Sequence, residues 1–179
     1  DDNEEAGVDS IALVDEPAIE RQWMAFSKQP KAYTFEITNE EKRVISGPLM
    51  IADLPIYRRD SEDNEYYVVF NPETIRKIVY KYMKEGRTNS VNEMHETAVD
   101  GVFMFESFII DDRKKTPRGY EELTEGSWFG SFKVENDSIW EQVKSGDFKG
   151  FSVEGLFEED KELTMDKELV EAIVSEIVG

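Results

Sequence analysis

Short runs of β-branched and aromatic residues recur along the chain and are separated by turn-forming residues. Such runs suit the pleated, half-buried surface of a β-strand. The clearest one covers residues 65–70, with the sequence EYYVVF, and ends at Asn71-Pro72. From this pattern we expect strands over residues 10–14, 32–38, 43–51, 65–70, 91–95, 102–110, 128–134 and 148–157.

Helical periodicity begins after the run at residues 65–70. Asn71 can accept a hydrogen bond from the first free amides of a helix, and Pro72 has the backbone angle of a first helical turn. We therefore predict a helix from residue 72 to about residue 85, with Gly86 as its stop. Its buried stripe comprises Ile75, Ile78, Val79 and Tyr82.

Two further helices are expected nearer the C-terminus. A short one runs from about residue 137 to residue 144 and closes at Gly146. A longer one covers residues 164–178 and is amphipathic. Its apolar face comprises Leu169, Val170, Ile173, Val174 and Ile177.

Few of the predicted strands are spaced for parallel crossover connections. We therefore predict an α+β fold, a mostly antiparallel sheet or small barrel flanked by helices. The length of 179 residues favours one domain, over residues 1–160. Residues 161–179 form a C-terminal amphipathic helix that either packs on this domain or is detachable, with the acidic run at residues 158–162 as a candidate hinge. The charged segment 111–126 is predicted to be a surface loop.

Charge narrows the classes of partner. Lysine and arginine number 21 against 40 acidic residues, for a formal net charge of -19. Such a surface opposes association with nucleic acid or anionic lipid, so we expect neither as a partner. No apolar stretch approaches the roughly 18 residues that span a bilayer, and residues 1–5 lack the positive region of a signal peptide. Cysteine is absent, so disulfides and thiolate metal sites are excluded and the cytoplasm is the expected compartment.

His95 is the single histidine of the chain. Any mechanism that needs an imidazole must therefore use it. Taken alone, a lone histidine near a strand end is more often a hydrogen-bonded structural residue than a catalyst. A metal site is weaker still, because catalytic zinc usually takes more than one imidazole or thiolate. We expect no metal and no cofactor.

Ser152 lies in the segment GFSVEG, residues 150–155. Small residues around a serine let a substrate backbone approach and let amides face a developing oxyanion. The G-x-S-x-G elbow of α/β-hydrolases does not fit, since Gly155 comes one position too late. Taken alone, the segment is better explained as a strand with glycines at bulges or close contacts.

Together, the segments around these residues resemble the two motifs of tailed-phage prohead proteases. Residues 92–96 (NEMHE), followed by Asp100-Gly101-Val102, look like that family's histidine motif. Residues 146–153 (GDFKGFSV) look like its serine motif, in which a helix ends at a glycine and leads into a G-F-S strand. The histidine and the serine lie 57 residues apart, an interval of the order that the family uses. The resemblance extends over roughly residues 42–157.

One departure indicates a branch of that family. Most prohead proteases carry an "S-L-V-x-x-P-A" strand after the serine, whereas here the similar SIALVDEPA stands at residues 10–18. The chain therefore resembles the circularly permuted, XkdF-like phage serine proteases. The implied fold is that of the herpesvirus assembly proteases, a small barrel with surrounding helices, because permutation preserves a fold whose termini lie close together.

The resemblance implies Ser152 as nucleophile and His95 as general base. For the group that orients the imidazole, Asp9 is the first choice, because the family places this member on the permuted strand. Glu154 is the second choice, since residues two apart share a strand face. Glu106 and Glu96 remain alternatives.

Three functions follow as hypotheses. The first is a serine endopeptidase that trims phage scaffold and major capsid proteins, and itself, inside an assembling prohead in the host cytoplasm. Homo-oligomer formation is left open. The second is a structural or assembly role for the same fold with a weak or inactive site, and the third is an acidic binding module unrelated to proteases. The first predicts that Ser152 and His95 project from neighbouring strands into a shallow groove, with strand 10–14 beside the serine strand.

Overall fold

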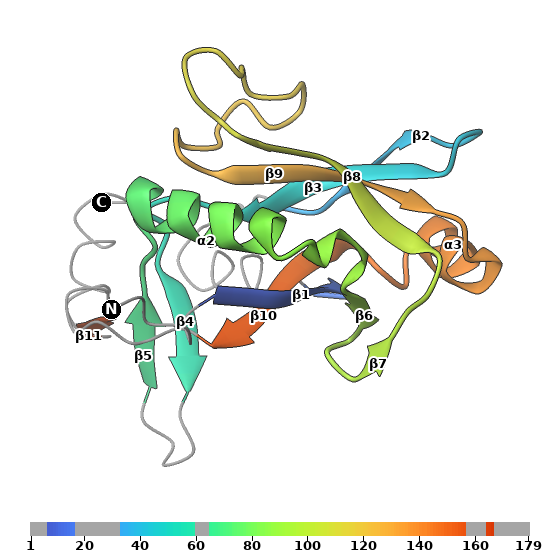
Figure 1. The fold of residues 1–179 in the computed structure, drawn as a ribbon, viewed down its shortest axis with the longest axis horizontal. Helices are drawn as coiled ribbons and strands as arrows, with labels where there is room; N and C mark the ends of the chain where they lie inside the picture. The colour runs from blue at the N-terminus through green and yellow to red at the C-terminus, as the bar shows by residue number, and fades with distance from the viewer. Residues whose placement is uncertain (1–6, 17–32, 60–64, 157–163, 167–179) are drawn as a thin grey trace, which may run out of the picture.

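The computed structural model describes residues 7–16, 33–59, 65–156 and 164–166. The strands in this part of the chain form three sheets (Figure 1). The first has the order β10-β1-β6-β7, the second β2-β3-β9-β8 and the third β11-β5-β4. The strands are β1 (Gly7–Val14), β2 (Glu36–Asn39), β3 (Val44–Met50), β4 (Ile56–Arg59), β5 (Glu65–Val68), β6 (Val91–Glu93), β7 (Thr97–Ala98), β8 (Val102–Ile109), β9 (Trp128–Val134), β10 (Gly150–Leu156) and β11 (Thr164–Asp166).

The first sheet holds both segments singled out in the sequence. Strand β1 lies in its middle, antiparallel to β10 and parallel to β6. Ala12 is paired with Ser152 on one side and with Asn92 on the other. The expectation that strand 10–14 lies beside the serine strand is therefore confirmed.

The second sheet is antiparallel throughout and packs over the first (Figure 1). Aromatic rings join the two layers. The ring of Phe151 on β10 lies 4.7 Å from that of Phe132 on β9, and 5.0 Å from that of Phe35. All three side chains are buried. The strand that carries Ser152 is thus anchored through the residue directly before it.

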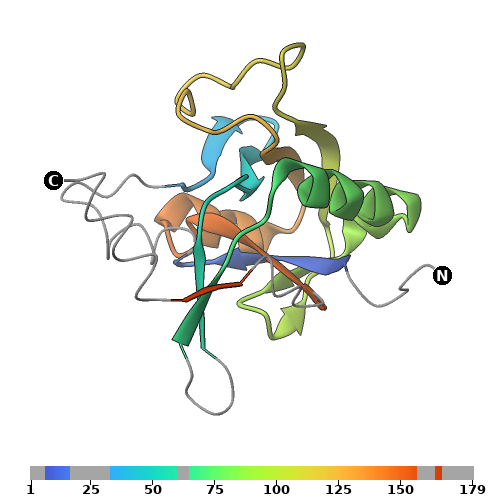
Figure 2. The ribbon, with the colours of Figure 1, turned by 90° about the vertical axis from the view of Figure 1, so that its left-hand side faces the viewer.

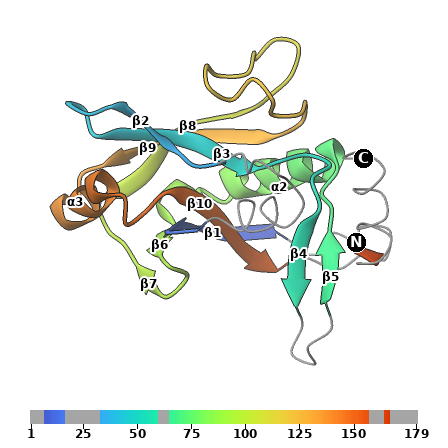
Figure 3. The same cartoon turned by 180° about the vertical axis from the view of Figure 1, so that it is seen from behind.

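Helix α2 (Pro72–Lys84) lies along one side of the two layers (Figures 1 and 3). The Asn71 side chain accepts a hydrogen bond from the Thr74 amide, as predicted for the N-cap. The predicted apolar stripe is buried, and the Tyr82 ring meets Trp128 of β9 edge-on at 5.3 Å. Burial raises the pKa of Tyr82 above its usual value, so the phenol stays neutral in the core.

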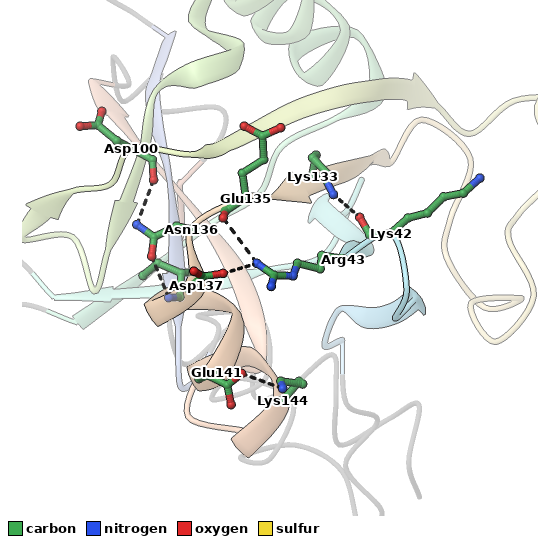
Figure 4. A network of polar contacts seen from close by, with 10 residues as sticks. Lys42, Arg43, Asp100, Lys133, Glu135, Asn136, Asp137, Glu141 and Lys144 are labelled. Carbon is green, nitrogen blue, oxygen red and sulfur yellow. Dashed lines mark hydrogen bonds and ion pairs between the residues drawn. The ribbon is translucent and has the colours of Figure 1, made fainter.

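A network of polar contacts fixes the N-terminal end of helix α3 (Asp137–Ser145), the helix that precedes β10 in the chain (Figure 4). Asn136 caps the helix by accepting from the Ile139 amide, and its Nδ2 donates to the Asp100 carbonyl. Arg43 Nη1 binds the Asp137 carboxylate at 2.6 Å. The turn that follows the histidine segment is thereby tied to the helix that precedes the serine strand.

The third sheet extends away from the two layers, as the β4–β5 hairpin shows in Figures 2 and 3. Strand β11 pairs with β5 in this sheet. The predicted helix over 164–178 is therefore wrong at its start, because residues 164–166 are extended; the rest of that segment, and the apolar face assigned to it, lie outside the described residues. The sequence pattern also missed β4, β7 and a 3-10 turn, η1 (Arg87–Asn89).

The coarse fold class is confirmed as α+β with mostly antiparallel strands. Segment 111–126 is without helix or strand, as predicted. In the described part of the chain, no helix is long and apolar enough to cross a membrane.

Candidate active site

The first sheet has one apolar and one polar face near β10. Residues directly opposite each other in an antiparallel pair share a face, and successive residues alternate. Phe151 and Val153 of β10 therefore face the core together with their partners Ile11 and Leu13. The opposite face carries Ser10, Ala12, Ser152 and Glu154. Ser152 is half-buried on this polar face.

His95 lies at the tip of the hairpin between β6 and β7. The backbone turns at Met94 and His95, whose φ angles are 53° and 63°, and the Glu96 amide closes the turn on the Glu93 carbonyl at 3.0 Å. Positive φ at both central residues is the geometry of a type I′ turn. Such a conformation disfavours residues with a Cβ, so this turn stores backbone strain beneath the imidazole.

Glu154 meets His95 across the polar face. Its Oε2 lies 3.5 Å from His95 Nδ1, and the two side chains are 44% and 39% exposed. This separation is longer than a tight hydrogen bond, yet contacts in catalytic sites are often loose before substrate binds. A carboxylate at Nδ1 favours the tautomer that carries the proton there, which leaves Nε2 free to accept one.

Asn92 links the same two residues. Its Nδ2 donates to Glu154 Oε2 at 2.7 Å, and its Oδ1 accepts from the His95 amide at 3.0 Å. It also donates to Ser10 Oγ at 2.6 Å. Neither Asn92 nor Ser10 is among the site residues that the sequence predicts, although Asn92 opens the segment that resembles the histidine motif. Asparagine at a turn more often signals local backbone hydrogen bonding than a site.

The other carboxylates considered for the orienting role lie elsewhere. Asp9, the first choice, is bound to Arg87 Nη1 at 3.0 Å, at a register shift of β1. Glu106 belongs to the second sheet, where it accepts from the Ser131 hydroxyl at 2.7 Å. Glu96 is exposed in the turn itself. Among the carboxylates considered, Glu154 is therefore the one that lies against His95, whereas Asp9 lies against Arg87.

The expected neighbourhood of Ser152 and His95 needs one correction. The two residues do not come from neighbouring strands, because β1 lies between β10 and β6. Ser152, Ala12 and Asn92 form one row across the sheet. Two strand spacings, about 10 Å, therefore separate the backbones of Ser152 and Asn92.

Comparison with known proteins places the chain among phage proteins. A family model described as "Putative phage serine protease XkdF" matches residues 35–161. The "Phage-like element PBSX protein XkdF" of Bacillus subtilis (strain 168) is 25% identical over 143 residues, which cover 80% of this chain and 47% of that protein. The chain thus spans about half the length of this relative. No solved structure matches this chain.

Proposed function

Because the chain belongs to the XkdF family of phage serine proteases, we propose that it is a serine endopeptidase with Ser152 as nucleophile and His95 as general base. Glu154 takes the role of the orienting carboxylate. The observation that supports this most is the contact between Glu154 Oε2 and His95 Nδ1 at 3.5 Å, on the face of β10 that also carries Ser152.

The proposed reaction is an acyl transfer in two halves. His95 Nε2 takes the proton of Ser152 Oγ as this oxygen attacks the carbonyl carbon of the scissile peptide. The carbon–nitrogen bond then breaks, and the leaving amine receives the proton from His95. In the second half, water attacks the Ser152 ester, His95 again takes and returns a proton, and the free acid leaves. The Glu154 carboxylate stabilises the imidazolium that forms in each half.

The proposed substrates are the scaffold and major capsid proteins of the phage that encodes the chain, and the chain itself. The setting is the assembling prohead in the host cytoplasm. The name of the family supports a phage protease, and the charge of -19 disfavours nucleic acid as a competing ligand. The alternative is an assembly protein with the same fold and an inactive site.

Co-expression with the capsid and scaffold proteins of the same phage tests the proposal. We expect the wild-type chain to shorten at least one of them, and Ser152→Ala and His95→Ala each to leave both at full length. Ser138→Ala, which removes an exposed hydroxyl at the start of α3, is the matched control and should cleave like the wild type. A folded wild-type chain that cleaves neither protein nor itself would overturn the proposal in favour of the assembly role.

A further inference from the structure

On the polar face of the first sheet, the Asn92 side chain makes three hydrogen bonds to described residues. It is only 8% exposed, and these hydrogen bonds reach three different segments. The segments are β1 through Ser10, β10 through Glu154, and the β6–β7 turn through the His95 amide. A buried amide with all these partners is expensive to replace, because each partner would lose its hydrogen bond.

These partners fix which way the amide points. The His95 amide can only donate, so the oxygen of Asn92 must face it. The Glu154 carboxylate can only accept, so the nitrogen must face it, and the two protons of this nitrogen are used by Glu154 on β10 and Ser10 on β1. No other side chain of similar size offers one acceptor and two donors in this arrangement.

One hydrogen bond of Asn92 holds the Glu154 carboxylate, and another holds the backbone amide of His95. The donation at 2.7 Å holds Glu154 Oε2, the same oxygen that faces His95 Nδ1. The acceptance at 3.0 Å holds the His95 amide in a turn with positive φ. Asn92 therefore fixes both ends of the contact between Glu154 and His95.

We infer that Asn92 is a positioning residue, which holds Glu154 against Nδ1 of His95 and so keeps the imidazole proton on Nδ1. This inference rests on the proposed function, in which His95 Nε2 must be free to accept the serine proton. Asn92 acts through these two residues and touches no reacting atom. The elements around Asn92 carry several charged groups. Glu154 lies on β10 and Lys149 directly before it, and Glu93 and Glu96 lie beside the turn. Asp9 lies on β1, where it is bound by Arg87.

The single histidine makes a direct test practicable. With ¹⁵N-labelled histidine, the two ring nitrogens of His95 report which one carries the proton in the neutral form. We expect the Nδ1–H form in the wild type and a shift toward the Nε2–H form in Asn92→Ala. The second readout is the rate at which a fluorophosphonate probe labels Ser152, which should fall at least tenfold in this variant.

Two further variants separate positioning from a loss of fold. Asn92→Asp keeps the shape but replaces both donors by an acceptor, and we expect labelling to fall at least as far as in Asn92→Ala, because the new carboxylate repels Glu154 instead of binding it. Asn71→Ala removes the cap of α2, far along the chain from this network, and should lower stability while leaving the tautomer and the labelling rate unchanged.

The outcomes separate the two proposals. An unchanged tautomer and labelling rate in folded Asn92→Ala or Asn92→Asp would overturn the positioning role. A wild-type chain that the probe does not label at Ser152, but whose His95 tautomer still depends on Asn92, would overturn the proposed proteolysis and leave the positioning of His95 in place.

Discussion

At the scale of single residues, Glu154 and Asp9 are the two main candidates for the carboxylate that orients His95, and a matched pair of variants distinguishes them. Glu154→Gln keeps the size of the side chain but removes the charge that faces His95. We expect kcat to fall by roughly 10²- to 10⁴-fold with KM nearly unchanged, because the imidazolium loses its stabilising partner. Steady-state cleavage kinetics on a capsid-derived peptide measure this.

Asp9→Asn is the counterpart, since Asp9 is bound by Arg87 in the same sheet. We expect its kcat to equal that of the wild type. A large fall for Asp9→Asn together with an unaffected Glu154→Gln would restore Asp9 as the orienting residue.

The turn beneath His95 offers a second prediction at this scale. Met94 has a φ of 53° and is 40% exposed. The strain of its left-handed backbone is therefore offset by little burial of its apolar side chain. Asparagine adopts this conformation more readily. Met94→Asn should therefore raise the free energy of unfolding by about 1 kcal/mol. Urea denaturation measures it, with Met83→Asn on the exposed face of α2 as a control that should lower stability.

At the scale of elements, helices α2 and α3 were easier to predict than the short strands. Asn71 caps α2 and Asn136 caps α3 at their N-terminal ends. Gly86 lies just after α2 and Gly146 ends α3, both with a left-handed backbone, as local signals in the sequence suggest. Strands β7 and β11 have two and three residues, too few to show alternation. They exist because a neighbouring strand supplies their hydrogen bonds, which a local pattern does not encode.

The pairing of β1 with β10 yields a prediction for this scale. A Cβ added to Gly155 would lie 1.9 Å from the Gly7 carbonyl oxygen, so these strands can approach only with glycine there. Gly155→Ala should destabilise the protein by about 3 kcal/mol, because the two backbones must move apart. Gly146→Ala, with φ 82° and no atom near its Cβ, should cost only about 1 kcal/mol. Thermal unfolding of both variants tests the difference, and equal losses would contradict it.

At the scale of the whole molecule, the candidate site draws on both ends of the described chain. The sequence placed Ser152 and His95 in motifs and predicted the strand between 10 and 14 beside the serine strand. It placed Asp9 first among the orienting carboxylates, whereas in the structure Glu154 lies against His95 and Asp9 pairs with Arg87, next to a register shift between Val8 and Ser10. Such a shift depends on the partner strand and leaves no mark in the residues themselves.

The central position of β1 has a consequence for synthesis. Ala12 and its partner Ser152 are 140 residues apart in the chain, so this pairing has a very high contact order. During translation β1 is made before β10, so it must wait for the segment that holds Ser152. Ser152 and the β6–β7 turn therefore cannot be brought together on a nascent chain that ends before residue 150, because β1, which lies between them, has no β10 to pair with until then.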